Sequence, residues 1–426
     1  MEPARIESAL EILTYHGAEN KPLDQICHGY FKARRYIGSK DRQAISAYVY
    51  GVMRHRASCD WWGLERGLSP LLMGSYDAAR IRLLAYLWLF EKTARDQIGI
   101  LFSGEKYAPE ILTDKERSIF VKLPELDKLS PWVEGEYPEW LLPFLRRRFG
   151  DDLKAEMQAF LSQAPVDLRV NTLKATREEA LENLKNTGLA VGPTKLAPLG
   201  LRIEGRENIT QTTAFRDGIV EVQDEGSQLV VSLMDVSPGQ SVLDLCAGAG
   251  GKTLALAAKL ENKGRVVATD TAEWRLKRTK ERLKRAGACN VELRPISGHQ
   301  DKYLKRQKER FDHVLVDAPC SGSGTWRRNP DQKWNIGPQD IIELAALQQS
   351  LLETAAPLVK KGGSLVYATC SLLCEENEDV AQSFLEKHPE FSLDPCGING
   401  EDYLSLSPLK NETDGFFAAK FVKRVE

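Results

Sequence analysis

The sequence predicts a multi-domain protein in which an all-α region precedes a small α+β module and a larger α/β domain with a doubly wound, mostly parallel sheet. In the first third, apolar residues recur at intervals of three and four, which is typical of helices. The middle part mixes short strand and helix patterns, and the last part alternates apolar strands with helices. A length of 426 residues suits two or three such domains.

The helical patterns of the first third define a predicted domain at residues 1–130. The patterns cover residues 6–17, 24–37, 41–56 and 76–92. Residues 120–137 are rich in proline and charge and show no clear period, which is typical of a linker between domains.

A compact α+β module is predicted at residues 137–215, on the basis of mixed patterns that extend slightly past it. Helices are expected at residues 138–150 and at 177–188, where Gly188 ends the second one. Strands are expected at residues 166–174, 199–205 and 218–224.

The α/β domain is predicted at residues 216–426. Short apolar strands are expected at 241–246, 264–270, 290–295, 311–319 and 363–370, with helices at 253–261, 272–287 and 340–359 between them. The final strand pattern, 415–424, has no helix after it, so we expect it to pair antiparallel.

Composition and charge exclude several classes of protein. The formal net charge of −2 excludes a global polycation, so nucleic-acid binding would need local patches. The start of the chain does not resemble a signal peptide, and the longest apolar run, residues 83–90, is too short to span a membrane. The eight cysteines form no CxxC pair, which disfavours zinc fingers and redox motifs. We therefore expect a cytoplasmic protein with free thiols, no metal and no membrane partner.

A glycine-rich turn follows the first strand of the α/β domain. A P-loop would need glycine at Cys246, and the dinucleotide fingerprint would need glycine at Thr253, so neither motif fits. Asp270, 20 positions after Gly250, stands where a carboxylate receives ribose hydroxyls. The turn predicts a phosphate-free adenosine ligand such as S-adenosylmethionine; a plain strand-to-helix turn remains the alternative.

Cys320 and Cys370 each follow a predicted parallel strand, so both are expected at the carboxyl edge of the sheet, where ligands bind. A pair of thiols there suits methylation of pyrimidine carbon 5. One thiolate adds to carbon 6 and makes carbon 5 nucleophilic, and a base later removes the carbon 5 proton. Asp317 is placed to stabilise the adduct through the ring nitrogen, and the base must be unstacked to reach the site.

The motifs around these residues resemble those of the RsmB/Sun family of RNA cytosine-5 methyltransferases. The resemblance covers roughly residues 137–422 and rests on DLCAGAGGKT, VQDEGSQLV, DAPCSGSGTWRRNPD, WNIGPQDIIELAALQ and YATCSLLCEENEDV. It implies a Rossmann-like methyltransferase core with a seven-stranded sheet and an RRM-like module before it. The helical start resembles, less tightly, the NusB-like RNA-binding domain of bacterial members.

The resemblance also implies roles for individual residues. Cys370 would be the nucleophile, Cys320 would help release the product, and Asp317 would hold the base edge; the residues alone leave open which cysteine attacks. The cofactor would be S-adenosylmethionine, bound by Cys246, Ala247, Gly248, Gly250, Gly251, Lys252, Asp270 and Asp317. The aspartate that members use for the adenine amino group is replaced here by Ser297 and Gly298, and Asp301 could substitute only if the loop shifts.

RNA contacts are expected from two places. Arg327, Arg328 and Asn329 follow the Pro-Cys motif on a glycine-rich loop and could reach a phosphate beside the target base. Arg169 and Asn171 are implied by the resemblance alone. The acidic stretch at residues 375–379 is interpreted as the charged start of a helix.

The sequence therefore predicts an S-adenosylmethionine-dependent RNA cytosine carbon-5 methyltransferase that acts as a monomer on small-subunit ribosomal RNA. Transfer RNA is the alternative substrate for the same chemistry. A non-catalytic RNA-binding assembly factor is the alternative from another class, and the presence of both Cys320 and Cys370 argues against it.

Overall fold

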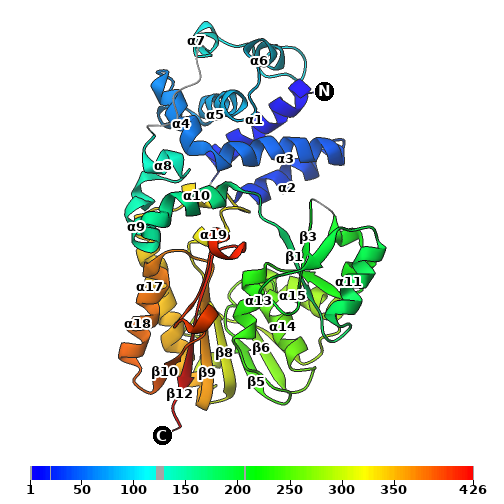
Figure 1. The fold of residues 1–426 in the computed structure, drawn as a ribbon, viewed down its shortest axis with the longest axis vertical. Helices are drawn as coiled ribbons and strands as arrows, with labels where there is room; N and C mark the ends of the chain where they lie inside the picture. Colours follow the sequence, from blue (N-terminus) through cyan, green and yellow to red (C-terminus); the bar gives the residue numbers. More distant parts are fainter. Residues whose placement is uncertain (1, 20, 121–128, 206–207, 426) are drawn as a thin grey trace. The chain divides into compact units, whose positions relative to one another are not determined.

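The computed structural model describes residues 2–19, 21–120, 129–205 and 208–425 (Figure 1). The chain forms two compact units. The first consists of Met1–Ser162 and Trp326–Pro338, and the second of Gln163–Thr325 and Gln339–Glu426. The chain thus leaves the second unit shortly after Cys320 and returns to it thirteen residues later. The predicted boundaries at residues 1–130, 137–215 and 216–426 stay predictions.

The described part of the first unit is built from helices. They are α1 (Glu2–Ala18), α2 (Leu23–Ala33), α3 (Ser39–Arg54), α4 (Arg56–Glu65), α5 (Ser75–Leu89), α6 (Arg95–Leu101), α7 (Asp114–Ser118), α8 (Pro131–Glu134), α9 (Leu142–Phe149) and α10 (Leu153–Leu161). The four predicted helices correspond to α1, α2, α3 and α5. Helix α5 buries residues on all its sides, from Ala78 to Leu89, because it lies at the centre of this unit's core. Most of the predicted linker, residues 121–128, lies outside the described residues.

The segment Trp326–Pro338 is an integral part of the helical unit. The indole of Trp326 is 2% exposed and meets the ring of Phe160 edge-on at 6.0 Å. The Asp331 carboxylate accepts a hydrogen bond of 3.0 Å from the backbone N–H of Leu23 at the start of α2. Trp334 donates its indole N–H to the carbonyl of Met53 over 3.3 Å. These contacts fix the segment within the helices.

The second unit begins with a small antiparallel sheet in the order β2-β3-β1-β4. Its strands are β1 (Val166–Val170), β2 (Val191–Pro193), β3 (Gly200–Ile203) and β4 (Val220–Val222), and its helices are α11 (Arg177–Asn186) and α12 (Thr213–Arg216). Leu168, Leu184 and Leu201 pack in its core without exposure. The predicted α+β module is confirmed. Strand β2 was not predicted, because three residues are too few to show a period.

The large sheet of the second unit runs in the order β10-β12-β9-β8-β5-β6-β7, with β11 paired to β12. Its strands are β5 (Ser241–Asp244), β6 (Arg265–Asp270), β7 (Val291–Pro295), β8 (Phe311–Asp317), β9 (Val359–Thr369), β10 (Phe391–Asp394), β11 (Leu404–Leu406) and β12 (Phe416–Lys423). Strands β5 to β9 are parallel, and β12 pairs antiparallel with β9, as predicted. The doubly wound α/β fold is confirmed. The sheet has eight strands where seven were expected.

Helices cover both faces of this sheet because the strand residues alternate between two apolar cores (Figure 1). Val314 and Val316 face the core that includes α17 (Pro338–Ala355) and α18 (Glu378–Lys387). Leu315 between them faces the core of α13 (Glu225–Ser232) and α14 (Gly251–Lys259). The remaining helices are α15 (Glu273–Ala286), α16 (Lys302–Lys305) and α19 (Pro408–Asn411). The strand ends therefore meet at one edge, free of the covering helices.

Candidate active site

The two predicted catalytic cysteines meet at the carboxyl edge of the sheet. Strands β8 and β9 are parallel neighbours, with Asp317 of β8 opposite Ala368 of β9. Cys370 follows the last residue of β9 directly, and Cys320 lies three residues after the end of β8. Their Sγ atoms are 3.4 Å apart. The structure thus brings the two thiols together as the sequence predicted.

The Cys320 thiol is in an environment that favours its protonated form. The hydrogen bond with Cys370 and burial both raise the pKa of Cys320 well above its ordinary value. Both cysteines are half-buried and neither is in a disulfide. A sulfur with a raised pKa is a stronger base once it has lost its proton, and removal of the carbon 5 proton by Cys320 requires this property.

Lys252 and Asp317 form an ion pair next to the thiols. Lys252 lies in the first turn of α14, and its Nζ is 2.7 Å from Oδ2 of Asp317 at the end of β8. Burial lowers the pKa of Lys252, while the attraction of Asp317 and of the Cys370 thiolate raises it, and the net shift is upward. The ammonium group therefore stays charged, and it holds the Asp317 carboxylate at the sheet edge.

The glycine-rich turn has the backbone that a close ligand contact needs. Gly248 and Gly250 have φ angles of 56° and 81°, in the left-handed region that suits glycine. A side chain at Gly250 would collide with Thr279, whereas the space beside Gly248 is open. Gly251 begins α14, and Cys246 and Ala247 lead into the turn from β5. The cofactor contacts expected from this turn stay predictions.

The residues around the turn fit S-adenosylmethionine. The Asp270 carboxylate, 7% exposed, accepts hydrogen bonds from the N–H groups of Gly248 (2.8 Å) and Ala272 (2.7 Å), and a carboxylate has further acceptor sites for ribose hydroxyls. Asp244 is 1% exposed, and its Oδ1 has no hydrogen-bond partner among the described residues. An unpartnered acceptor at this edge suits the ammonium group of the methionine part.

The carboxylate of Asp301 accepts hydrogen bonds from its own loop. Its carboxylate accepts from the N–H and hydroxyl of Ser297, both at 2.9 Å, and from the N–H of Tyr303 at 2.7 Å, at the start of α16. These hydrogen bonds lower the pKa of Asp301. Gly298 beside it has a φ of 148°. The residue that contacts adenine therefore stays open, as the sequence left it.

Arg327 lies in the segment that belongs to the helical unit. It is 5% exposed, and its carbonyl accepts a hydrogen bond of 2.9 Å from Arg54. Arg328 and Asn329 are half-buried. The contact of these three residues with RNA stays a prediction.

Arg169 and Asn171 join the small sheet to the methyltransferase-like core. Arg169, 4% exposed, donates to the carbonyl of Gly251 over 2.6 Å and to the side chain of Gln223. Asn171, 3% exposed, donates to the carbonyls of Gly218 (2.9 Å) and Ala286 (2.8 Å). Arg169 thus stabilises the end of the glycine-rich turn through its hydrogen bond to Gly251. The contact of these two residues with RNA stays a prediction.

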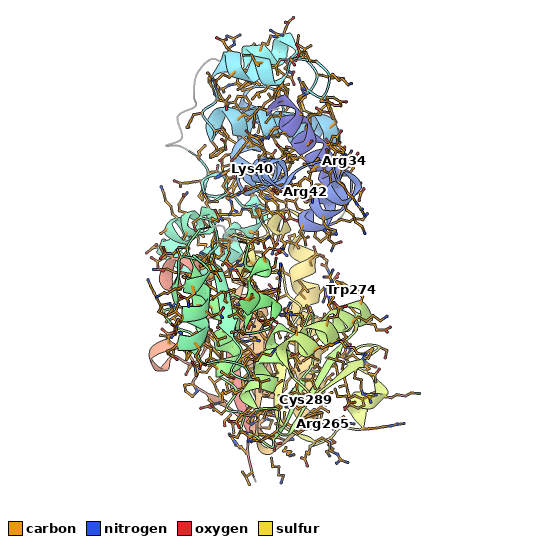
Figure 2. All side chains as sticks on the ribbon, turned by 90° about the vertical axis from the view of Figure 1, so that its right-hand side faces the viewer. Arg34, Lys40, Arg42, Arg265, Trp274 and Cys289 are labelled. Carbon is orange, nitrogen blue, oxygen red and sulfur yellow. The ribbon has the colours of Figure 1, made fainter. Side chains whose placement is uncertain are left out.

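Exposed aromatic and basic side chains lie on both units (Figure 2). Trp274 is 55% exposed near the start of α15, with the guanidinium groups of Arg275 and Arg278 at 5.4 and 5.2 Å from its ring centroid. Arg265 and Cys289 lie together in the second unit, at a distance from Trp274 (Figure 2). In the helical unit, Arg34 stacks on Tyr30, 3.8 Å from the ring centroid.

Sequence reasoning missed the buried carboxylate of Glu376. The interpretation of residues 375–379 as a charged helix start holds for Glu378 and Asp379, which are in the first turn of α18. It is wrong for Glu376, which lies in the short 3-10 helix η9 (Cys374–Glu376) and has no exposure. The sequence offered one indication that Glu376 could be buried: it follows Ser371 by only five residues, and Ser371 comes directly after the predicted catalytic Cys370.

Two kinds of feature are absent from the described part of the chain. No group of three or more His, Cys, Asp or Glu side chains there is arranged to hold a metal ion. None of its helices is long and apolar enough to cross a membrane.

The fold and the site define an S-adenosylmethionine-dependent methyltransferase. Comparison with family models gives the same class: residues 231–422 match the 16S rRNA methyltransferase RsmB/F family, and residues 137–210 match its ferredoxin-like domain. The latter match agrees with the antiparallel module around β1 to β3.

Curated relatives match almost the whole chain. The ribosomal RNA small subunit methyltransferase B of Yersinia enterocolitica is 38% identical over 92% of this chain and 92% of its own. The protein of the same name from Photorhabdus laumondii is 33% identical over 92% of this chain and 93% of its own. The solved structure of PH0851 is 30% identical, with a TM-score of 0.81 over 99% of both chains. The chain belongs to the RsmB/F family of rRNA methyltransferases.

Proposed function

We propose that this protein transfers a methyl group from S-adenosylmethionine to carbon 5 of a cytosine in small-subunit ribosomal RNA, through a covalent adduct with Cys370. The observation that carries the proposal is the 3.4 Å separation of the Cys320 and Cys370 sulfurs at the carboxyl edge of the sheet. Carbon 5 of a pyrimidine needs one group that adds to the ring and one that assists proton removal, and a pair of thiols supplies both.

Each residue of the site has a defined part in this proposal. The Cys370 thiolate bonds to carbon 6 of the flipped-out cytosine, and this addition moves an electron pair onto carbon 5. Asp317 accepts a hydrogen bond from the amino group of cytosine, and from the ring nitrogen once that nitrogen is protonated in the adduct. Lys252, 2.7 Å from its Oδ2, fixes its orientation. S-adenosylmethionine supplies the electrophilic methyl group. Cys320, once its own proton has passed to water, accepts the carbon 5 proton, after which the Cys370–carbon 6 bond breaks and the thiolate returns.

The RNA substrate is proposed from the relatives. Both curated relatives described above carry the name ribosomal RNA small subunit methyltransferase B and match more than nine-tenths of this chain. With this substrate, we expect the protein to act in the cytoplasm. We expect it to act as a monomer, because the thiols, the ion pair and the glycine-rich turn all come from one chain.

The experiment is methylation of RNA by the purified protein with methyl-labelled S-adenosylmethionine. Small-subunit rRNA as transcript, small-subunit rRNA in partly assembled particles, and total tRNA are offered separately, and bisulfite sequencing locates 5-methylcytosine. We expect one cytosine of small-subunit rRNA to be labelled. Label in tRNA alone would overturn the substrate, and label on an exocyclic amino group would overturn the chemistry.

A further inference from the structure

Glu376 is a fully buried carboxylate whose acceptor sites are all occupied. Its Oε1 accepts from the backbone N–H of Ser321 (2.8 Å) and from Nε2 of Gln348 (3.0 Å). Its Oε2 accepts from the hydroxyls of Ser321 and Ser371, both at 2.5 Å. Four donors match the roughly four lone-pair sites of an ionised carboxylate. No lysine or arginine forms an ion pair with it in the part of the chain that the structure describes.

The donors to Glu376 come from the two cysteine loops and the helix behind them. Ser321 follows Cys320, and Ser371 follows Cys370, so one carboxylate holds the residue after each thiol. Gln348 of α17 also donates to the carbonyl of Pro319 over 2.9 Å, on the other side of Cys320. Glu376 is therefore the group that binds both loops at once.

Further contacts between the two loops depend on the same geometry. The Ser321 and Ser371 hydroxyls are 3.2 Å apart, and Ser323 lies 3.2 Å from Ser371. The N–H of Gly324 donates to the carbonyl of Cys370 over 2.8 Å. Both serines that contact Glu376 are less than 5% exposed, so water cannot replace the carboxylate without opening the site.

We propose that Glu376 is a positioning residue of the methyl-transfer reaction, one that holds the Pro-Cys and Thr-Cys loops together through Ser321 and Ser371. It does not touch the base or the cofactor, and the inference rests on the proposed function. Removal of the carboxylate leaves buried hydroxyl and amide donors without an acceptor, which is unfavourable in the folded state. The two loops then separate, and the Cys320 and Cys370 sulfurs lose the relative position that the reaction needs.

The charge of Glu376 also distinguishes the two thiols. Its negative charge adds to the Cys370 hydrogen bond and to burial in raising the pKa of Cys320. The cation of Lys252 interacts instead with Cys370. The carboxylate thus favours a protonated Cys320. Glu376 therefore acts on the proton-handling thiol through its charge as well as through its hydrogen bonds.

The test compares Glu376→Gln with Glu386→Gln in the full-length protein. Both substitutions remove one charge, but Glu386 is exposed on α18, where its carboxylate accepts a hydrogen bond from Gln382. We expect Glu376→Gln to lower kcat for cytosine methylation about 10- to 100-fold, with Kd for S-adenosylmethionine within about twofold of wild type. Glu386→Gln should match wild type. Unchanged kcat in Glu376→Gln would overturn the inference.

Two thiol measurements report on geometry and charge without any need for activity. Diamide takes up two hydrogen atoms as it oxidises a thiol pair, and we expect it to form the Cys320–Cys370 disulfide about tenfold more slowly in Glu376→Gln, because the sulfurs are held less closely. Alkylation of Cys320 by iodoacetamide should begin at a lower pH, because a negative charge has gone. A wild-type disulfide rate and pH profile would overturn the proposed role.

A folding control keeps the outcomes separate. If urea unfolding shows Glu376→Gln to be unfolded, the double variant Ser321→Ala, Ser371→Ala removes the two hydroxyl donors and leaves the carboxylate with its N–H partners. This variant should reproduce the slow disulfide formation, and a wild-type rate would count against the inference. A wild type that methylates no cytosine would refute the proposed function instead, and the two thiol measurements would still decide the part of Glu376.

Discussion

The Sγ atoms of Cys320 and Cys370 lie 3.4 Å apart although fifty residues separate them along the chain. The parallel pairing of β8 and β9 produces this contact, because parallel strands deliver their carboxyl ends to the same edge of a sheet. The two thiols are equivalent in kind but not in surroundings. Their different neighbours lead to different expectations for the two cysteine variants.

Cys370→Ala should abolish methyl transfer, because this thiol forms the bond to carbon 6 in the proposed reaction, and the neighbouring Cys320, whose pKa is raised, keeps its proton and is a poor nucleophile. We expect the labelled-methyl assay to fall to background. Cys289→Ala is the matched control, since Cys289 is exposed and lies at a distance from Trp274 (Figure 2). Turnover by Cys370→Ala at more than a few per cent of the wild-type rate would remove Cys370 from the role of nucleophile.

Cys320→Ala should instead stabilise the covalent intermediate. The variant retains Cys370 and can still form the bond to carbon 6, but it lacks the thiol 3.4 Å away that assists the release step. We expect a protein–RNA band on a denaturing gel that depends on S-adenosylmethionine and is much weaker for wild type. The double variant Cys320→Ala, Cys370→Ala should show no such band; a band there would place the attachment on another residue.

The Lys252–Asp317 pair should behave as one unit. Lys252 is 8% exposed, and its removal leaves the Asp317 carboxylate without the cation that orients it. Loss of one partner of such a pair costs about 3–5 kcal/mol when the pair is fully buried, and less here because Asp317 is one-third exposed. We expect Lys252→Met and Asp317→Asn each to lower kcat/KM by about 10²-fold or more. The double variant should lose little beyond either single variant, whereas multiplicative losses would show that the residues act separately.

The sequence predicts those site residues that are placed by the strand pattern, and it misses those that are placed by contacts between loops. Cys320, Cys370 and Asp317 each stand at the end of a strong apolar strand, so sheet topology alone places them together. Glu376 could not be predicted in this way. Its burial depends on serine hydroxyls from two loops far apart in sequence, and an acidic residue before a helix normally faces water.

The burial of Arg327 could not be predicted from its local sequence. A run of basic residues on a glycine-rich loop is typical of a phosphate contact, and nothing local shows that the segment packs among helices. The structure assigns Trp326–Pro338 to the helical unit, where Trp326 and Asp331 are its buried anchors. Strands β10 and β11 were missed because four and three residues give too short a pattern to separate from a loop.

Asp331 should make the stability of the helical unit sensitive to acid. Its carboxylate, 3% exposed, accepts from the N–H of Leu23 at the start of α2, where Pro22 at the N-cap provides no side-chain cap, and it lies 3.7 Å from Nε2 of His16. Burial raises the pKa of Asp331, but the interactions with His16 and with Leu23 lower it by a larger amount, so the net shift is downward. A carboxyl with a depressed pKa contributes stability above its unfolded value of about 3.9, and this contribution is lost as the pH falls through the folded value.

Asp331→Asn should therefore unfold at lower urea than wild type at pH 7, by about 1–2 kcal/mol, because the charged acceptor at the start of α2 is gone. The difference should shrink as the pH falls below about 4, where Asp331 of the unfolded wild-type chain takes up a proton, and it should vanish below the lowered pKa of the folded state. Urea titrations followed by circular dichroism at pH 7 and at acid pH measure this. Glu65→Gln, at the exposed end of α4 in the same unit, is the charge-matched control, and we expect its loss of stability to stay small at both pH values. A deficit for Asp331→Asn that persists unchanged in acid would mean that the carboxylate charge is not what anchors the segment, and that the loss comes from packing alone.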